Sequence, residues 1–373
     1  MATFEVKIYK ITIEEHPNAD AIELAVVGEY RSIVSKGLFQ DGVLAAYIPE
    51  GAVVPKLVLQ RLNLWDAEND KGKLAGKQGT RVKAIRLRNV LSQGLIYPVE
   101  QTEGLSELVD PAGEHHSVVE GQDVRDVLNI TKYEPQIPTA MGGEVFNAFG
   151  NTIGYDVENY KRFPDVFVEG EEVIMTEKLH GTWCCFGYHP DITHPVVTSK
   201  GLSAKGLAFK MNEANKHNVY IKGLQLTTDD SMDDVVTRHR RNLPSLEPFY
   251  FLGEIYGQGV QDLTYGVSSN TEFRVFDVYI GQPGAGRYLN YDEMITMTES
   301  LGLNTVPLLY RGPFSKEKMT EMTSGKTTIG GSHIKEGLVV KPVTERRDNT
   351  VGRVMLKSIS DDYLLRKNGT EYN

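Results

Sequence analysis

The sequence predicts an α+β protein with two β-rich regions, and three observations indicate this fold class. Short alternating or apolar runs, typical of strands, recur in the first ~130 residues and again from Glu169 onward. Glycine, proline, asparagine and aspartate separate these runs, as they do at turns between strands. Helical patterns interrupt only the second region, for example from Asp292 to Leu301, where Gly302 marks the expected end of a helix.

The first region is predicted to form a small β-barrel, because five or six short strands fall within about a hundred residues. The candidate strands are Phe4–Ile13, Ala21–Val27, Ser32–Val34, Val43–Ile48, Arg81–Leu87 and Gly94–Val99. The run His16–Leu24 resembles the opening of OB-fold modules of the tRNA-binding type, and Ala46–Gly51 fits a later strand and turn of such a barrel. We therefore expect an OB-like domain over residues 1–130.

Residues 131–160 are rich in loop-forming residues, including Pro135 and Pro138, and are predicted to connect two domains. The second domain is expected over residues 161–373. Within it, Ser231–Asp234 has the form of a capping box at the start of a helix.

The composition and net charge of the chain exclude several classes of protein and site. A net charge of −10 over 373 residues argues against a protein that coats nucleic acid by charge alone. No apolar run has membrane length, and the first residues alternate like a strand, so we expect neither a membrane span nor a signal peptide. The adjacent Cys184 and Cys185 suit a reducing cytoplasm. The histidines lack zinc-ligand spacing, and Gly325-Lys326-Thr327 is no phosphate-binding loop because Thr320 replaces the required glycine.

Four cations follow one predicted strand of the first domain and its exit. On an OB-fold they could lie beside a nucleic-acid backbone, or they could form a solvated sheet face, and the sequence leaves both open. They are Arg81, Lys83, Arg86 and Arg88.

The hexapeptide Glu177-Lys178-Leu179-His180-Gly181-Thr182 places a lysine at the end of an apolar strand. A free lysine is a poor nucleophile, since only about one in a thousand is neutral near pH 7. Burial, a neighbouring cation or a metal ion can lower its pKa enough for attack. Taken alone, the segment fits either a nucleophile or a surface turn.

Four further predicted strands each carry residues from the same few chemical types, which are carboxylates, lysines and aromatic or apolar side chains. They are Phe249–Gly257 with Glu254, Arg274–Tyr279 with Phe276 and Asp277, Lys335–Pro342 with Glu336, Val339 and Lys341, and Arg353–Ser358 with Lys357. In this order, the five segments resemble the motifs of covalent nucleotidyltransferases, which include DNA ligases, RNA ligases and mRNA capping enzymes. Glu-Lys-x-His-Gly-Thr in place of Lys-x-Asp-Gly is similar to RNA ligase 2-type enzymes. The resemblance implies a catalytic domain of antiparallel sheets, ATP-grasp-like, behind an N-terminal OB domain.

The resemblance also implies the residues of an ATP site. Lys178 is the expected nucleophile, which forms a lysyl-AMP. Glu336 is expected to hold Mg²⁺ or Mn²⁺, and Lys357 to contact the α-phosphate, with Lys341 as a second cation.

The resemblance further implies how the nucleoside is bound. Glu254 is expected to bind the ribose, and Phe276 and Val339 to enclose the adenine ring. Glu177 is expected to accept a hydrogen bond from the adenine amino group, and His180 to lie near the leaving pyrophosphate. Gly181 and Lys200 complete the expected ATP-binding set. Asp277 is expected to orient its neighbours.

The expected function is ATP-dependent RNA ligation in RNA repair, sealing 3′-hydroxyl and 5′-phosphate ends at nicks in a duplex. The expected partner is RNA or an RNA-containing nicked duplex, and the protein is expected to be a monomer in the cytoplasm, cellular or virus-encoded. Alternatives are a DNA ligase, a capping guanylyltransferase or a non-catalytic nucleic-acid-binding protein. Departures from the family pattern at Met355, Trp183 and Lys200 leave substrate preference open.

Overall fold

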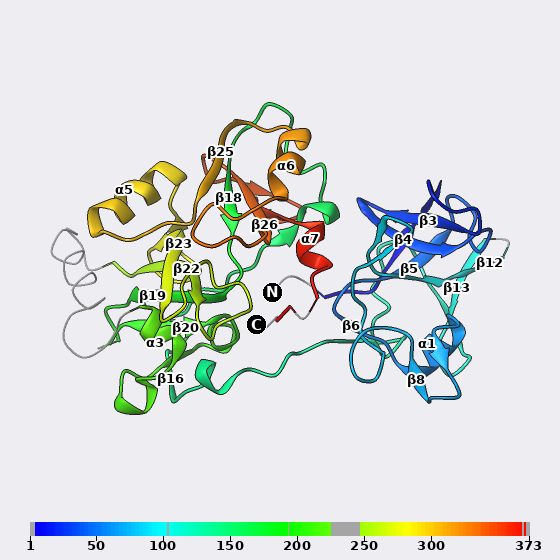
Figure 1. Cartoon of the computed structure of the whole chain (residues 1–373), viewed down its shortest axis with the longest axis horizontal. Coiled ribbons are helices and arrows are strands. Elements are labelled where there is room, and N and C mark those ends of the chain that lie inside the picture. The colour runs from blue at the N-terminus through cyan, green and yellow to red at the C-terminus, as the bar shows by residue number, and fades with distance from the viewer. Residues whose placement is uncertain (1–3, 103, 193, 225–246, 368, 371–373) are drawn as a thin grey trace. The chain divides into compact units, whose positions relative to one another are not determined.

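The computed structural model describes residues 4–102, 104–192, 194–224, 247–367 and 369–370. The chain divides into two compact units, shown in Figure 1. The N-terminal unit comprises Ala2–Glu134 and Lys161–Pro164, and the C-terminal unit comprises Pro135–Tyr160 and Asp165–Asn373. The capping pattern at Ser231–Asp234 lies outside the described residues.

The N-terminal unit is built from short strands and one helix. Two three-stranded sheets, β1-β5-β11 and β2-β3-β4, enclose buried aliphatic residues such as Ile8, Ile48 and Leu108. Its elements are β1 (Lys7–Lys10), β2 (Thr12–Glu15), β3 (Ile22–Val27), β4 (Tyr30–Ser35), β5 (Leu44–Ile48), β6 (Ala52–Val53), α1 (Lys56–Arg61), β7 (Trp65–Asp66), β8 (Lys71–Gly72), β9 (Ile85–Leu87), β10 (Val90–Ser92), β11 (Leu95–Pro98), β12 (Glu100–Thr102), β13 (Leu105–Val109), β14 (His115–Ser117) and β15 (Thr131–Lys132).

One strand of this unit differs from the prediction. Only Ile85–Leu87 of the expected strand Arg81–Leu87 is a strand, and it pairs with β10 in a hairpin. Arg81 instead forms isolated bridges with Val53 and Ala75, and its guanidinium lies 3.7 Å from the ring centre of Tyr133. The exposed hairpin turn uses Arg88 and Asn89 at positive φ, a geometry that twists two strands into register.

The C-terminal unit contains two five-stranded sheets. The β18 sheet has the order β17-β29-β26-β18-β25, and the β22 sheet has the order β20-β19-β22-β23-β24. All neighbours are antiparallel except β17 and β29. The strands are β16 (Val145–Asn147), β17 (Glu158–Asn159), β18 (Glu172–Lys178), β19 (Thr182–Tyr188), β20 (Val196–Ser199), β21 (Leu207–Phe209), β22 (Phe249–Gly257), β23 (Thr271–Ile280), β24 (Arg287–Tyr288), β25 (Leu308–Pro313), β26 (Gly337–Pro342), β27 (Arg347–Asp348), β28 (Gly352–Arg353) and β29 (Leu356–Ile359).

Helices cover these sheets. Helices α3 and α5 contact the β22 sheet, and α6 contacts β26 and β29 of the β18 sheet (Figure 1). Gly302 follows α5 at φ 70°, as the glycine signal predicted. The described helices are α2 (Lys200–Ser203), α3 (Val219–Gly223), α5 (Tyr291–Leu301), α6 (Lys316–Thr323) and α7 (Asp361–Leu364), with 3₁₀ turns η1 (Thr139–Met141), η2 (Tyr160–Arg162) and η3 (Glu213–Asn215).

The predicted α+β class is confirmed, with strands dominating both units. Residues 135–160, expected as a connection, group with the C-terminal unit, where β16 pairs with β21. The predicted strand Arg353–Ser358 is split between β28 and β29. Among the residues that the structure describes, no helix is long and apolar enough to cross a membrane.

Candidate active site

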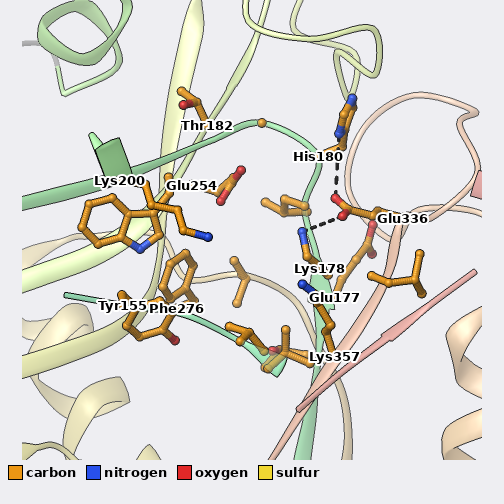
Figure 2. Close-up of a pocket in the computed structure, with 18 of the residues that line it drawn as sticks. Tyr155, Glu177, Lys178, His180, Thr182, Lys200, Glu254, Phe276, Glu336 and Lys357 are labelled. Carbon is orange, nitrogen blue, oxygen red and sulfur yellow. Dashed lines mark ion pairs between the residues drawn. The ribbon is translucent and has the colours of Figure 1, made fainter. Parts of the chain in front are cut away.

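A cavity of about 330 Å³ in the C-terminal unit is lined by both large sheets. Figure 2 shows the side chains that point into it. All ten residues of the predicted ATP site line this one cavity, although they come from segments between residues 177 and 357. They are Glu177, Lys178, His180, Gly181, Lys200, Glu254, Phe276, Val339, Lys341 and Lys357.

Strand alternation in the β18 sheet explains part of this convergence. Val339 of β26 lies opposite Thr176 of β18 and Lys357 of β29, and directly opposed residues of an antiparallel pair share a face. Residues two positions along also share that face, which adds Lys178 and Lys341. One face of this sheet therefore presents three lysines and Val339 to the cavity.

The β22 sheet supplies the opposite wall. Glu254 pairs with Trp183, so both side chains lie on the cavity face of the sheet. The register between β22 and β23 shifts where Leu252 faces Asp277 and Gly253 faces Val275. Phe276 is thus the extra residue of a β-bulge, and such a bulge re-aims a side chain. Alternation from Arg274, which lies opposite Glu254, places Phe276 on the cavity face. The bulge lets the next residue, Asp277, share that face.

Lys178 is held by Glu336 at a distance of 2.6 Å between Nζ and Oε1 (Figure 2). Burial lowers the pKa of Lys178, but Glu336 and Glu254 outweigh it and raise this pKa above the ordinary value. The side chain is therefore a charged ammonium group near pH 7, and a positive charge that opposes these two carboxylates would favour its neutral form.

Lys357 has the opposite shift. Burial, and then the charges of Lys178 and Lys200, lower the pKa of Lys357 to about 8. Lys200 itself opens α2 and pairs with Asp156 at 3.3 Å. Three cations crowded into one enclosed space repel one another, so a polyanionic ligand would relieve their mutual repulsion.

Glu254 is enclosed on the same wall. Burial raises the pKa of Glu254 to about 8, although Lys178 opposes the shift. The oxygens of a carboxyl group accept hydrogen bonds in either protonation state, which suits a ligand hydroxyl group.

Gly181 and Glu177 shape the turn around Lys178. A Cβ atom at Gly181 would lie 2.1 Å from the carbonyl oxygen of Ile255, so only glycine fits this close approach. The Glu177 carboxylate accepts hydrogen bonds from Thr327 and Thr328 at 2.6–2.8 Å. The segment Gly325-Lys326-Thr327, which lacks the sequence pattern of a phosphate-binding loop, therefore helps through Thr327 to hold the strand that carries Lys178.

His180 is buried and held on both ring nitrogens. Nε2 lies 2.8 Å from Oδ1 of Asp262, and Nδ1 lies 2.8 Å from the hydroxyl group of Tyr363. Its backbone N–H donates to the hydroxyl group of Tyr265 at 2.6 Å. Nδ1 is also 3.8 Å from Glu336 (Figure 2). The imidazole therefore faces the carboxylate that pairs with Lys178.

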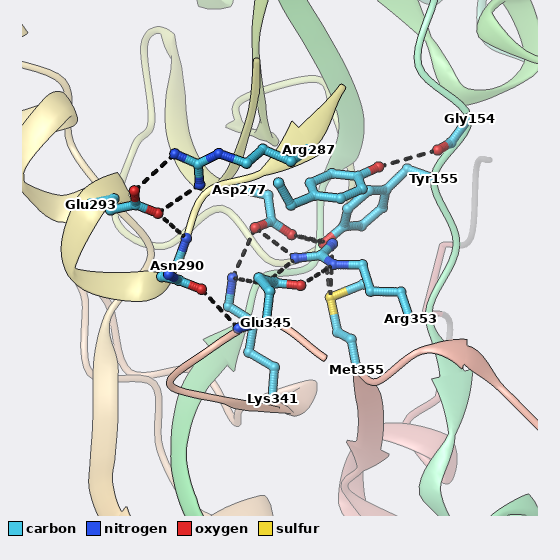
Figure 3. A network of polar contacts seen from close by, with 11 residues as sticks. Gly154, Tyr155, Asp277, Arg287, Asn290, Glu293, Lys341, Glu345, Arg353 and Met355 are labelled. Atoms are coloured by element: carbon cyan, nitrogen blue, oxygen red, sulfur yellow. Dashed lines mark hydrogen bonds and ion pairs between the residues drawn. The ribbon is translucent and has the colours of Figure 1, made fainter. Parts of the chain in front are cut away.

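Asp277 lies in a fully buried ion network beside the aromatic wall (Figure 3). It accepts hydrogen bonds from Lys341 at 2.8 Å, from Arg353 at 2.7 and 3.0 Å and from the Tyr155 hydroxyl group at 2.7 Å. Burial would raise the pKa of Asp277, but Arg353 and Lys341 outweigh it and bring the pKa to about 2. The ammonium group of Lys341 is thus already paired, and Asp277 contacts Lys341, Arg353 and Tyr155 at once.

Several residues in or beside the cavity were not predicted from the sequence. Tyr155 packs 5.2 Å from the ring centre of Phe276, and Asp156 pairs with Lys200, yet both lie in the segment interpreted as a connection. Asp262 and Tyr363 reach His180 from 82 and 183 residues away. The only signal for Tyr155 was an aromatic-acidic pair just before the catalytic motifs.

The four cations predicted to bind nucleic acid differ in their exposure to solvent. Arg81 is half-buried against Tyr133, whereas Arg86 and Arg88 are exposed on the β9-β10 hairpin, with Lys83 exposed just before it. Ile85 and Leu87 on the same hairpin are 55% and 42% exposed.

Family models match both units. Residues 171–359, which carry every strand of the cavity face described above, match the model of the RNA ligase family. The chain belongs to the RNA ligase family. Residues 5–99 match a model described as an OB-fold domain, which confirms the predicted N-terminal fold.

Solved RNA ligases from Naegleria gruberi share the fold. A mutant with ATP and Mn is 22% identical and has a TM-score of 0.73, covering 96% of this chain and 98% of that one. A mutant with AMP and Mn is 23% identical, with a TM-score of 0.75 and coverage of 97% and 98%. The same ligase with pyrophosphate is 23% identical, with a TM-score of 0.73 and the same coverage. A search of curated proteins found no significant match.

Proposed function

We propose that this RNA ligase uses ATP to join a 3′-hydroxyl end to a 5′-phosphate end, through a lysyl-AMP on Lys178. The observation that carries the proposal is the Lys178–Glu336 pair in an enclosed cavity that also holds Lys200 and Lys357. The ATP-bound, AMP-bound and pyrophosphate-bound forms of the Naegleria ligase give further support.

In the first step, the Lys178 amine attacks the α-phosphorus of ATP. A nitrogen–phosphorus bond forms, the bond from the α-phosphorus to the bridging oxygen breaks, and pyrophosphate leaves with that electron pair. The amine gives up its extra proton to solvent or a neighbouring carboxylate. This step requires a neutral amine and stabilisation of charge on the phosphate oxygens.

The carboxylate of Glu336 is suited to hold Mg²⁺ or Mn²⁺, because these ions prefer hard oxygen ligands and keep several waters. When bound there, such an ion would oppose the charge of Glu336, favour the neutral form of Lys178 and draw charge from the phosphate oxygens. Glu336 is only 7% exposed and already lies within 2.6 Å of the nucleophile.

The remaining cavity residues bind the nucleotide. Lys357 and Lys200 face the phosphates, where the anion relieves their mutual repulsion. Phe276 and Val339 receive the adenine ring, and Glu254 binds ribose hydroxyl groups. Lys341 acts through Asp277, with which it is paired, and supports the aromatic wall.

In the later steps AMP passes from Lys178 to a 5′-phosphate, and a 3′-hydroxyl group attacks that activated end and releases AMP. We infer a nicked duplex containing RNA as the substrate, gripped by the domain over residues 1–130 through Lys83, Arg86 and Arg88. We further infer a cytoplasmic monomer, with residues 131–160 joining that domain to the catalytic domain at 161–373. The buried free thiols of Cys184 and Cys185 are in keeping with a reducing compartment.

The proposal is tested with ATP labelled at the α-phosphate, with Mg²⁺ or Mn²⁺. Wild type should acquire a covalent label that Lys178→Ala abolishes. The matched control is Lys210→Ala, which removes an exposed lysine paired with Glu144 and should label like wild type. Absence of label from ATP with either metal would contradict the proposal, and labelling from GTP alone would favour a capping enzyme.

A further inference from the structure

The segment over residues 360–367 contributes to the cavity wall. Tyr363 and Leu364 of this segment line the cavity. The backbone N–H of Ser360, at the start of α7, donates to the carbonyl oxygen of Glu336 at 2.8 Å. The segment is therefore fixed to the residue that holds Lys178.

Tyr363 reaches His180 with its hydroxyl group, 2.8 Å from Nδ1, while Asp262 occupies Nε2 at 2.8 Å. Burial opposes ionisation of Asp262, but hydrogen bonds from His180 and Arg366 keep its pKa far below the ordinary value. Asp262 is thus an ionised carboxylate beside Nε2, and the Tyr363 hydroxyl group can donate to Nδ1 or accept from it. Both contacts together leave one orientation of the imidazole.

Arg366 closes this arrangement into a ring of contacts. Its Nε donates to Asp262 at 3.1 Å, one terminal nitrogen donates to the carbonyl oxygen of Tyr363 at 2.9 Å, and its guanidinium lies 3.7 Å from the Tyr363 ring centre. Thr370 adds hydrogen bonds from its backbone and hydroxyl group to Asp262 at 2.8 and 2.9 Å. The side chains that hold His180 therefore also hold one another.

We infer that Asp262, Tyr363 and Arg366 are positioning residues for lysyl-AMP formation, acting through His180. The inference rests on the proposed function, and on the position of His180 near the departing pyrophosphate that the family resemblance implies. His180 is only 4% exposed and lies 3.8 Å from Glu336, so a change in ring orientation alters the wall next to the reacting lysine. The three residues therefore affect the rates of lysyl-AMP formation and of its reversal by pyrophosphate. They have little effect on the rate of sealing once AMP has been transferred to RNA.

The test separates the steps of ligation. Lysyl-AMP formation is measured in a single turnover, its reversal is measured with added pyrophosphate, and the last step is measured with RNA that already carries a 5′ AMP. Tyr363→Phe and Asp262→Asn should each slow the first two reactions about five- to tenfold or more, because the first removes a hydrogen bond to His180 and the second removes the negative charge that strengthens one. Sealing of the adenylylated RNA should change less than about twofold.

Two matched controls make the same chemical changes elsewhere in the unit. Tyr310→Phe removes a hydroxyl group that donates to Pro313 at the surface, and Asp292→Asn weakens an exposed bidentate pair with Arg311. Both should match wild type in all three reactions. Thermal unfolding is recorded for each variant, and if Asp262→Asn does not fold, Tyr363→Phe alone decides the test.

A double-mutant cycle tests whether the effect passes through His180. In a His180→Ala background, Tyr363→Phe should cause no further loss of the first step. The inference is overturned if the loss persists in that background, if all three reactions fall together, or if the first step is unchanged. Failure of the proposed function would look different, because wild type itself would then take no label from ATP.

Discussion

At the residue scale, the cavity concentrates buried charge that the folded chain must tolerate. Lys357 is the clearest case, because its ammonium group is enclosed beside Lys178 and Lys200. Its pKa of about 8 lies below the ordinary value of 10.5. The folded state therefore penalises the charged form, and this penalty is present in full below pH 8.

Replacing Lys357 by methionine should make the nucleotide-free protein more stable while lysyl-AMP formation is lost. The shift from 10.5 to about 8 corresponds to roughly 3 kcal/mol at pH 7. As pH rises from 8 to 10.5, the folded wild type loses the proton before the unfolded chain does, so the penalty is relieved and the gain disappears. Urea unfolding of variant and wild type at pH 7 and pH 10 measures this difference.

The surface substitution Lys318→Met is the control and should change stability by less than about 0.5 kcal/mol at either pH. A Lys357→Met protein less stable than wild type at pH 7 would mean that packing of the lysine stem outweighs its charge.

At the element scale, strands with a clear local pattern could be predicted, and their distortions could not. The range Phe249–Gly257 agrees with β22, and Lys178 ends β18, as expected for a lysine at the end of an apolar strand. The bulge at Phe276 depends on register against β22, and no glycine or proline in Arg274–Tyr279 signals it. The contacts of Asp262 and Tyr363 with His180 depend on the path of the chain over many residues, which no local pattern encodes.

The β9-β10 hairpin should contribute to RNA binding without affecting nucleotide chemistry. Replacing Lys83, Arg86 and Arg88 by alanine should weaken affinity for the nicked duplex and reduce the slope of log affinity against log salt by about 2.7, since each lost phosphate contact to a duplex lowers it by ~0.9. Lysyl-AMP formation should stay at the wild-type rate. Affinity titrations at several salt concentrations check the slope.

The control for this variant removes Lys216 and Lys318, which are exposed lysines of the C-terminal unit paired with Glu213 and Glu321. An unchanged salt slope in the hairpin variant would favour the other interpretation of these cations, a solvated sheet face.

At the scale of the whole molecule, acidic residues outnumber basic ones, and the chain carries a net charge of −10. The cavity itself holds both signs: its lysines Lys178, Lys200, Lys341 and Lys357 lie beside the acidic residues Asp156, Glu177, Glu254 and Glu336. An anionic substrate is therefore bound through contacts with individual lysines, whereas the net charge of the protein opposes nonspecific coating of RNA.

The buried network around Asp277 has a consequence for how the catalytic unit opens. Asp277 belongs to the β22 sheet, and its partner Lys341 belongs to the β18 sheet, so an ion pair without access to water joins the two layers. Separating them would leave uncompensated charges, at a cost of about 3–5 kcal/mol. Backbone amides of β23 and β26 should therefore exchange with deuterium at matching rates, as one cooperative unit. Asp277→Asn should make the two strands exchange at different rates, and wild-type strands that already differ would show that the layers unfold independently.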